Sequence, residues 1–378
     1  MAQEIRRLAR GEDNIKVLTL VGGSTMRPQM SSLEHGAHVV VGTPGRLLDH
    51  LQRESLDLQA LNTLVLDEAD RMLDMGFFDD IALVAKACPK DRQTLLFSAT
   101  FPEGIAALSR QFLHQPQQIQ LTEQHQDDKI RQRFYEVDNA QRLPAVALLL
   151  RHYRPVSTLA FCNTRQQCRD LLRLLRDQGF VALALHGEME QRERDQVLVQ
   201  FANRSCSVLV ATDVAARGLD IAQLEAVINV DLSPDAELHL HRIGRTGRVD
   251  QSGWALSLVG KRELGRVGNI VRAQGQAVAW HSLGELADDS QAEPLLPPMR
   301  TLQILAGRRD KIRPGDVLGA LTGDAGFSKE QIGKINVTDA CTYVAIERSV
   351  AAEALRKLSA GTVKGKRVKL HFLQVPAA

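Results

Sequence analysis

Acidic side chains gather where one short apolar run of the sequence ends. Residues 64–66 are Leu-Val-Leu, and Asp67, Glu68, Ala69 and Asp70 follow them directly. When a buried strand ends in two adjacent acids, the first can hold Mg²⁺ and the second can orient a water that attacks a phosphate. Acids in this position also cap the helix that follows. The quartet therefore predicts phosphate chemistry, with helix capping as the alternative.

A second polar segment, Ser-Ala-Thr at residues 98–100, follows the next apolar run at residues 95–97. Taken alone, hydroxyls at a strand end are more typical of an N-cap for the next helix. Their position behind the acidic quartet favours a link between Ser98, Thr100 and the same site.

The strongest cationic segment is residues 241–248, which read His-Arg-Ile-Gly-Arg-Thr-Gly-Arg. Cations interleaved with glycine make a poor core and a poor helix. Arginine stays charged and holds phosphate with two parallel N–H donors. The segment is typical of an arginine finger that reaches a γ-phosphate from another domain. A solvated turn is the alternative.

Two further segments open helices at strand ends. Residues 212–220 follow the apolar run 208–211 and include Thr212 and Asp220, and residues 43–46, Thr-Pro-Gly-Arg, follow the run 39–42. Helix N-termini with a nearby arginine receive phosphate well. Both segments therefore predict phosphate contacts.

The elements that must position these residues alternate between short apolar runs and segments of helical period. Unbroken Val/Ile/Leu-rich runs predict strands of a parallel sheet covered on both faces, and here the pattern occurs twice. The expected strands are residues 17–21, 39–42, 64–67 and 95–98, then 158–161, 181–185, 208–211 and 226–230. The expected helices are residues 47–53, 81–86 and 105–112, then 165–177, 191–201 and 235–241.

Two polar stretches divide the chain into three parts. Residues 115–132 are rich in glutamine, and residues 284–300 are rich in acids and proline, so both are predicted linkers. The part from residue 301 onward predicts strands at 302–306, 343–346 and 368–372 and helices at 315–321 and 351–358. That order is typical of a ferredoxin-like domain.

The charge of the chain is concentrated in this third part. It carries 13 Lys and Arg against 7 Asp and Glu, whereas the whole chain of 378 residues has a net charge of only +2. Such a basic tail indicates an anionic partner, with solubility alone as the alternative.

The overall composition excludes several classes of protein. With 44% hydrophobic and 24% charged residues, the chain is neither disordered nor a coiled-coil rod. No apolar run approaches the ~20 residues of a membrane helix, and the charged first ten residues lead into no apolar signal segment. We expect a cytoplasmic protein without a membrane partner.

Taken together, the motifs resemble those of DEAD-box RNA helicases, ATP-dependent enzymes named for the quartet at residues 67–70. The other matching segments, in the family's order, are residues 22–23, 43–46, 98–100, 191–194, 211–220 and 241–248. Residues 313–321 and 332–335 resemble the divergent RNA-recognition domain of bacterial DbpA-type members, and the resemblance extends to about residue 372.

The resemblance implies an α/β fold with two RecA-like parallel-sheet domains, the first of them incomplete, and a C-terminal α+β ferredoxin-like RNA-recognition domain. We expect the partial ATP-binding domain at residues 1–120, the helicase C-terminal domain at 133–283 and the RNA-recognition domain at 300–373.

The resemblance also implies ATP and Mg²⁺ as cofactors and assigns roles to residues. Asp67 would hold Mg²⁺ through water, Glu68 would polarise the attacking water, and Arg245 and Arg248 would reach the γ-phosphate. The nucleotide would also meet Gly218 and Asp220, and coupling to RNA would pass through Asp70, Ser98, Thr100 and His241. RNA would contact Gly23, Thr43, Arg46, His186, Gly187, Arg194 and Thr212 in the core, and Lys364, Lys366 and Arg367 in the tail.

The partner implied by the DbpA-type tail is a hairpin of large-subunit ribosomal RNA within ribosomal assembly particles. For the basic run at residues 364–369, a solvated strand edge is the alternative to a phosphate stripe. Ordinary RNA-recognition domains stack bases on two or three sheet aromatics. Here residues 302–306 have none and the third strand has only Tyr343, which leaves open where the RNA face lies.

One motif of the family is missing, because no G-x-x-x-x-G-K-[ST] phosphate loop occurs in the sequence. In the family this loop precedes a helix like residues 2–10, and its strand lies beside the strand that carries Asp67. Unpaired buried backbone groups cost ~1–3 kcal/mol each, so we do not expect residues 1–115 to form a stable nucleotide site alone.

Three interpretations follow from the missing loop. The favoured one is a fragment, or a misassigned start, of a working RNA-dependent ATPase. The second is an ATPase-inactive RNA-binding protein. The third is an unrelated nucleotide-dependent remodeller, for example of DNA.

Overall fold

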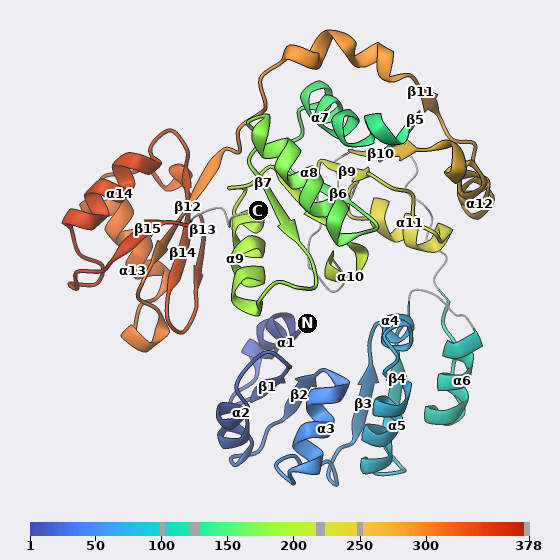
Figure 1. Ribbon diagram of the computed structural model, residues 1–378. Helices are drawn as coiled ribbons and strands as arrows, with labels where there is room; N and C mark the ends of the chain where they lie inside the picture. The colour runs from blue at the N-terminus through green and yellow to red at the C-terminus, as the bar shows by residue number, and fades with distance from the viewer. Residues whose placement is uncertain (99–102, 121–128, 217–223, 248–251, 374–378) are drawn as a thin grey trace. The chain divides into compact units, whose positions relative to one another are not determined.

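The computed structural model describes residues 1–98, 103–120, 129–216, 224–247 and 252–373. The chain divides into two compact units, Met1–Glu123 and Gln124–Ala378 (Figure 1). Each is described by itself. Among the residues singled out above, Thr100, Gly218, Asp220 and Arg248 lie outside the described residues.

The first unit holds its described strands as two separate parallel pairs. β1 pairs with β2, and β3 pairs with β4. The strands are β1 (Val17–Leu20), β2 (Val39–Gly42), β3 (Thr63–Leu66) and β4 (Gln93–Leu96). The helices are α1 (Ala2–Leu8), α2 (Met26–Leu33), α3 (Pro44–Gln52), α4 (Ala69–Asp74), α5 (Phe78–Ala87) and α6 (Glu103–Phe112).

The strand that leads to the acidic quartet, β3, therefore has a hydrogen-bonded neighbour along only one of its edges, among the strands that the structure describes. Within the described residues β3 pairs with β4 alone. Val65 on β3 is 47% exposed, and Phe97 just after β4 is 54% exposed. The other face packs on a small core that includes Leu66, Ile81 and Ile105. This agrees with the expectation that the strand before Asp67 lacks one neighbour.

The second unit begins with a continuous seven-stranded sheet in the order β11-β5-β10-β9-β6-β8-β7, and every pair in it is parallel. The strands are β5 (Ile130–Glu136), β6 (Thr158–Phe161), β7 (Ala182–Leu185), β8 (Val208–Ala211), β9 (Ala226–Asn229), β10 (Gly253–Val259) and β11 (Trp280–His281). The helices are α7 (Arg142–Tyr153), α8 (Arg165–Asp177), α9 (Gln191–Ala202), α10 (Asp213–Ala216), α11 (Ala236–Ile243) and α12 (Leu264–Gln274).

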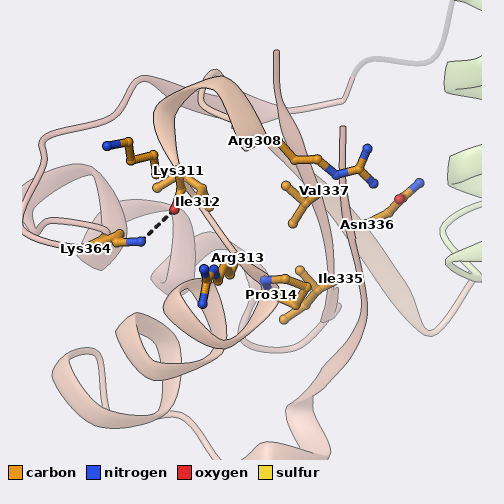
Figure 2. Close-up of a pocket in the computed structure, with 9 residues that line it drawn as sticks. All are labelled: Arg308, Lys311, Ile312, Arg313, Pro314, Ile335, Asn336, Val337 and Lys364. Atoms are coloured by element: carbon orange, nitrogen blue, oxygen red, sulfur yellow. Dashed lines mark hydrogen bonds between the residues drawn. The ribbon is translucent and has the colours of Figure 1, made fainter. Parts of the chain in front are cut away.

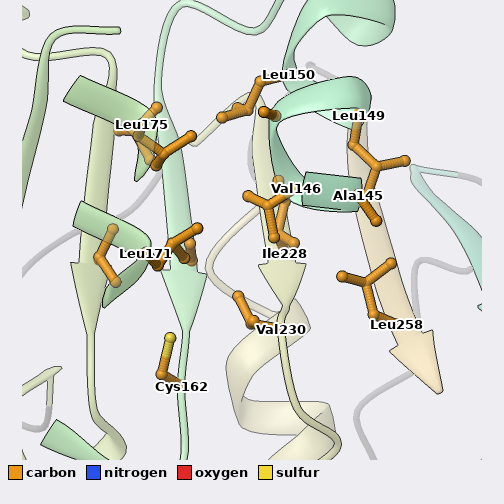
Figure 3. Packing of buried hydrophobic residues seen from close by; sticks show 14 of the residues in the cluster. Ala145, Val146, Leu149, Leu150, Cys162, Leu171, Leu175, Ile228, Val230 and Leu258 are labelled. Atoms are coloured by element: carbon orange, nitrogen blue, oxygen red, sulfur yellow. The ribbon is translucent and has the colours of Figure 1, made fainter. Parts of the chain in front are cut away.

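Four strands of this sheet, β6, β7, β8 and β9, are buried along their whole length, which is why they appear in the sequence as unbroken apolar runs. Figure 3 shows one face of the sheet, where Val146 and Leu149 of α7 pack above Ile228 and Leu258. Both RecA-like sheets were expected from the sequence, and the parallel alternation is confirmed.

The tail also folds as expected, with strands and helices in the order β-α-β-β-α-β. Its antiparallel sheet has the order β13-β14-β12-β15. The elements are β12 (Met299–Ile304), α13 (Pro314–Gly319), which continues into a π-helical turn (Ala320–Asp324), β13 (Ile332–Val337), β14 (Thr342–Glu347), α14 (Ala351–Ala360) and β15 (Leu370–Phe372). One sheet face packs on α13 and α14 through a core that includes Leu302, Val344 and Leu358.

The opposite face of the tail sheet is buried too, although it carries polar side chains. Thr301, Gln303 and Tyr343 are each less than 8% exposed. Thr301 Oγ1 accepts a hydrogen bond from Asn203 Nδ2 at 3.1 Å and lies 2.7 Å from Ser205 Oγ. These two partners follow α9, so this end of the sheet is fastened to the helicase C-terminal part.

The structure differs most from the sequence prediction at the first expected linker. Residues 115–132 were expected to be a linker, but β5 begins at Ile130. Its sequence, Ile-Arg-Gln-Arg-Phe-Tyr-Glu, contains three charged side chains, so it lacks the unbroken apolar run from which the other strands were predicted. The second linker was expected at residues 284–300, yet a 3₁₀ segment covers Leu283–Gln291 and β12 begins at Met299. Among the described helices, none is long and apolar enough to cross a membrane.

Candidate nucleotide and RNA sites

The acidic quartet lies where β3 passes into α4. Asp67 is half-buried, and its Oδ1 accepts a hydrogen bond from the Glu68 backbone N–H at 3.0 Å. Glu68 has a left-handed backbone with φ of 54° and makes no side-chain cap to α4. Such a conformation costs ~1–3 kcal/mol for a residue other than glycine and is concentrated at functional sites. This geometry favours the phosphate-chemistry interpretation over capping by Glu68.

Asp70 and Ser98 are brought together, as expected of coupling residues. The Asp70 backbone N–H donates to Ser98 Oγ at 3.3 Å, and the Ala69 N–H donates to the Phe97 carbonyl at 3.0 Å. Within the residues that the structure describes, Ser98 therefore bonds to the acidic turn.

The acidic turn fits Mg²⁺ only as part of a larger site. Among the described residues, no group of three or more His, Cys, Asp or Glu could hold a metal ion. Protein-bound Mg²⁺ usually keeps several waters and takes one or two carboxylates together with substrate phosphates. The Asp67 carboxylate suits that outer role, in which the ion would neutralise phosphate charge. The phosphate loop that would complete the site is absent from the sequence.

The expected RNA contacts of the first unit lie at one edge, at the ends of the paired strands β1 and β2. Gly23 follows β1 with a φ of 74°, which favours glycine. Thr43 precedes α3 as its N-cap residue, and its N–H donates to the Leu20 carbonyl at 3.1 Å. The Arg46 side chain is only 12% exposed, and both its terminal nitrogens donate to the Ser24 carbonyl at 3.1 Å.

The second unit also gathers its expected RNA residues at the carboxyl ends of parallel strands, where open α/β sheets bind ligands. His186 and Gly187 follow β7, and Thr212 follows β8. Arg194 on α9 donates to the Ala215 carbonyl at 2.6 Å. Segments expected separately from the sequence thus meet along one sheet edge.

The cationic segment begins in the last turn of helix α11 and continues past its end at Ile243, and its described residues separate into two groups. His241 and Arg245 are partly exposed, as a role toward a ligand requires. Arg242 is 1% exposed. Its Nε and Nη2 donate to the two Asp213 carboxylate oxygens at 2.7 and 2.6 Å.

Arg242 is a structural centre that the sequence did not reveal. Besides Asp213, it donates to the side-chain oxygens of Asn163 and Asn229, both at 3.2 Å, and its guanidinium lies over the Phe161 ring. It therefore joins the ends of β6, β8 and β9 to α11. Asp213 was quoted only as part of a motif. The available signal was an acid directly after a buried strand, which often pairs with a buried cation.

The tail carries a basic cleft of about 610 Å³, with Arg308, Lys311, Arg313 and Lys364 in its lining (Figure 2). Lys364 Nζ donates to the Lys311 carbonyl at 2.6 Å and lies 3.4 Å from an Asp316 oxygen. Lys366 Nζ lies 3.4 Å from the Asp310 carbonyl, and Arg367 is exposed. The expected phosphate stripe thus borders a cleft, and the sequence did not single out its arginines.

Comparison with known families gives three matches in succession along the chain. The DEAD/DEAH box helicase family matches residues 1–108, the helicase conserved C-terminal domain matches residues 140–250, and the DbpA RNA binding domain matches residues 301–371.

Curated relatives and a solved structure are similar to much of the chain. The ATP-dependent RNA helicase DbpA of Escherichia coli is 48% identical over 99% of this chain and 81% of its own length. The protein of that name in Bacillus subtilis is 34% identical over 94% of this chain and 79% of its own. Saccharomyces cerevisiae Dbp5 bound to RNA and ADP BeF3 is 29% identical, with a TM-score of 0.68 over 76% of this chain and 75% of that one.

Two RecA-like domains carry acids and arginines at their strand ends, and an RNA-binding domain follows them in the sequence. This combination defines an enzyme of the ATP-dependent helicase class. Within that class, the chain belongs to the DEAD-box RNA helicases of the DbpA type.

Proposed function

We propose that this chain acts as a cytoplasmic ATP-dependent RNA helicase on structured ribosomal RNA during assembly of the large ribosomal subunit. The observation that carries the proposal is the tail, which matches the DbpA RNA binding domain and presents a basic cleft. In this proposal the tail holds an RNA hairpin, and the strand ends of both units contact the RNA backbone near it.

The proposed chemistry needs Mg²⁺ and a phosphate loop. Asp67 would hold the ion through water, Glu68 would orient the attacking water, and Arg245 and Arg248 would stabilise the γ-phosphate. Because the sequence contains no phosphate loop, we expect hydrolysis only when such a loop is supplied. A phosphate-loop segment of the kind that the family resemblance implies, fused ahead of residue 1, would provide one.

The test of this proposal is RNA-stimulated ATP hydrolysis by that fusion. We expect stimulation by a large-subunit ribosomal RNA hairpin and little by an unrelated hairpin of equal length. Glu68→Gln should lower turnover by about 10²- to 10⁴-fold and leave RNA affinity unchanged. The matched control is Glu34→Gln, at an exposed position of the same unit. Unchanged hydrolysis in Glu68→Gln would remove Glu68 from the water-orienting role.

A second candidate function is an RNA-binding protein without ATP turnover. Within the described residues, the pairing of β3 with β4 alone favours it. It predicts that the chain as written binds the hairpin tightly, and that MgATP changes neither its affinity for RNA nor its melting temperature.

The tail contact can be tested in either case. Lys366→Ala should weaken hairpin binding and reduce the slope of log affinity against log salt by about one phosphate contact. Lys329→Ala, also exposed in the tail, is the matched control. An unchanged slope in Lys366→Ala would leave the basic run a solvated strand edge.

A further inference from the structure

Gln29 uses its whole side-chain amide within the first unit. Its Nε2 donates to the Val21 carbonyl at 3.2 Å and to Ser24 Oγ at 2.6 Å. Its Oε1 lies 3.0 Å from both Arg46 Nη1 and His50 Nε2. Since arginine can only donate, the amide oxygen must face Arg46, which fixes the orientation of the group. Both donors and both acceptor positions of the amide are thus occupied.

His50 completes the network from a fully buried position. Burial, followed by the charge of Arg46, lowers the pKa of His50, so the ring is neutral at physiological pH. A neutral imidazole has one donor and one acceptor nitrogen. Because Gln29 Oε1 can only accept, Nε2 carries the proton, and Nδ1 accepts from Ser55 Oγ at 2.8 Å.

Arg46 is the residue that this network fixes most firmly. Gln29 Oε1 and the Ser24 carbonyl accept from its guanidinium, and the Asp49 carboxylate lies 3.6 Å from its Nε. With 12% of its side chain exposed, the guanidinium faces the protein. It ties the loop after β1, which contains Gly23, to the first turn of α3, which follows Thr43.

We infer that Gln29 and Arg46 are positioning residues for RNA binding, and that Arg46 is not itself a phosphate ligand. They hold the loop at residues 22–24 in register with the start of α3, so that backbone N–H groups of both segments face one stretch of RNA backbone. The inference rests on the proposed RNA function. It assigns to Gln29 and Arg46 the task of holding the expected RNA-contacting edge of the first unit in one geometry.

The test measures binding of a fluorescent oligouridine of about ten nucleotides to the full chain, across about 50 to 200 mM salt. Arg46→Ala, Arg46→Lys and Gln29→Leu should each weaken binding by about tenfold. Lysine keeps the charge but cannot make the forked bonds to Ser24 and Gln29. The salt slope should stay at its wild-type value, and the double variant Gln29→Leu/Arg46→Ala should bind no more weakly than either single variant.

Controls separate positioning from folding. Gln52→Leu, at an exposed position of α3, should bind as the wild type does. Gln29→Glu keeps the two acceptor contacts and loses the two donor contacts, so an intermediate affinity at an unchanged melting temperature supports positioning. If Gln29→Leu unfolds the first unit, Gln29→Glu and Arg46→Lys decide the question.

Two results would overturn the inference. Near-wild-type binding by Arg46→Lys, together with a salt slope reduced by about one in Arg46→Ala, would make Arg46 a direct phosphate ligand. Unchanged binding in all the variants would remove the network from RNA binding. In either case the proposed function stands if Lys366→Ala still weakens hairpin binding, and it fails if the wild-type chain binds no RNA.

Discussion

The two RecA-like sheets carry the same kinds of strand-end motif on very different supports. In the second unit, β6, β7, β8 and β9 are buried along their whole length within a seven-stranded sheet. In the first unit, the described strands form two separate pairs, and β3 is half-exposed. Motif residues can therefore be intact in sequence while the sheet that positions them is open on one side.

The two units also differ in how an arginine secures their strand ends. Arg242 is 1% exposed and forms a bidentate ion pair with Asp213 inside the second unit. Arg46 keeps 12% exposure and bonds mostly to a backbone carbonyl and an amide. Breaking a pair of buried charges is costly, whereas hydrogen bonds from an arginine to neutral acceptors contribute less. The second unit should accordingly be the more stable one and the more sensitive to loss of its arginine.

The largest expected effect comes from breaking the buried ion pair between Arg242 and Asp213 in the second unit. Arg242→Gln should leave the Asp213 carboxylate without its partner and lower the free energy of unfolding by about 3–5 kcal/mol. Urea denaturation of the full chain, with hydrogen exchange used to assign each transition to a unit, measures this. Arg165→Gln, whose ion pair with Glu188 is more than half exposed, should cost less than about 1 kcal/mol. Equal losses in the two variants would contradict the central role of Arg242.

A slightly smaller effect is expected when one apolar side chain is shortened in each unit. Leu171→Ala, at a fully buried position of the second unit, should cost about 2–5 kcal/mol. Val65→Ala on β3 removes methyl groups from a side chain that is 47% exposed, so it should cost less than about 1 kcal/mol. A large loss in Val65→Ala, by the same urea measurement, would mean that β3 is covered in solution.

Acid should lower the free energy of unfolding of the second unit, because that unit contains the buried His239. Its ring is buried, has no hydrogen-bond partner among the described residues, and has its pKa lowered to about 4 by desolvation and then by Arg242. The unfolded chain, with a pKa near 6.5, binds the proton first as the pH falls. The stability contributed by neutral His239 is thus complete above pH ~6.5 and is lost progressively down to pH ~4, by up to roughly 3 kcal/mol.

Melting curves of wild type and His239→Leu between pH ~4 and ~7 check this expectation. The variant should show a flatter pH dependence in the second unit. His35→Leu, exposed in the first unit, should not change the slope there. If His239→Leu keeps the wild-type slope, other groups account for the acid sensitivity.

The central sheet of the second unit was predictable because its signals are local. Residues 158–161 and 208–211 were expected as strands and are strands with those bounds. The strand before Asp67 was expected one residue late, because an acid after an apolar run marks the strand end only approximately. β5 was missed because its two arginines lie between its apolar residues, and both stack over aromatic rings, those of Tyr153 and Trp254.

Contacts between residues that are far apart in the chain could not be predicted from local sequence patterns. Nothing in the spacing of Gln29, Arg46 and His50 shows that one amide joins them, because the contact depends on how α2 and α3 pack. The same holds for Arg242 and Asp213, which are 29 residues apart. The hydrogen bond from the Asp70 backbone N–H to Ser98 Oγ also joins two segments that are far apart in the sequence, and the coupling role of both residues stays a prediction of the family resemblance.

The fastening of the tail sheet to the end of α9 changes how the tail can serve the helicase. A domain on a flexible linker offers its ligand at an effective concentration set by linker length and stiffness. Here Thr301 is bonded to Asn203 and Ser205, and the Met299 N–H donates to the Arg204 carbonyl. Under the proposed function, the local concentration of tail-bound RNA at the strand ends beside Arg194 would therefore depend on the geometry of this contact and not on the length of the connecting chain.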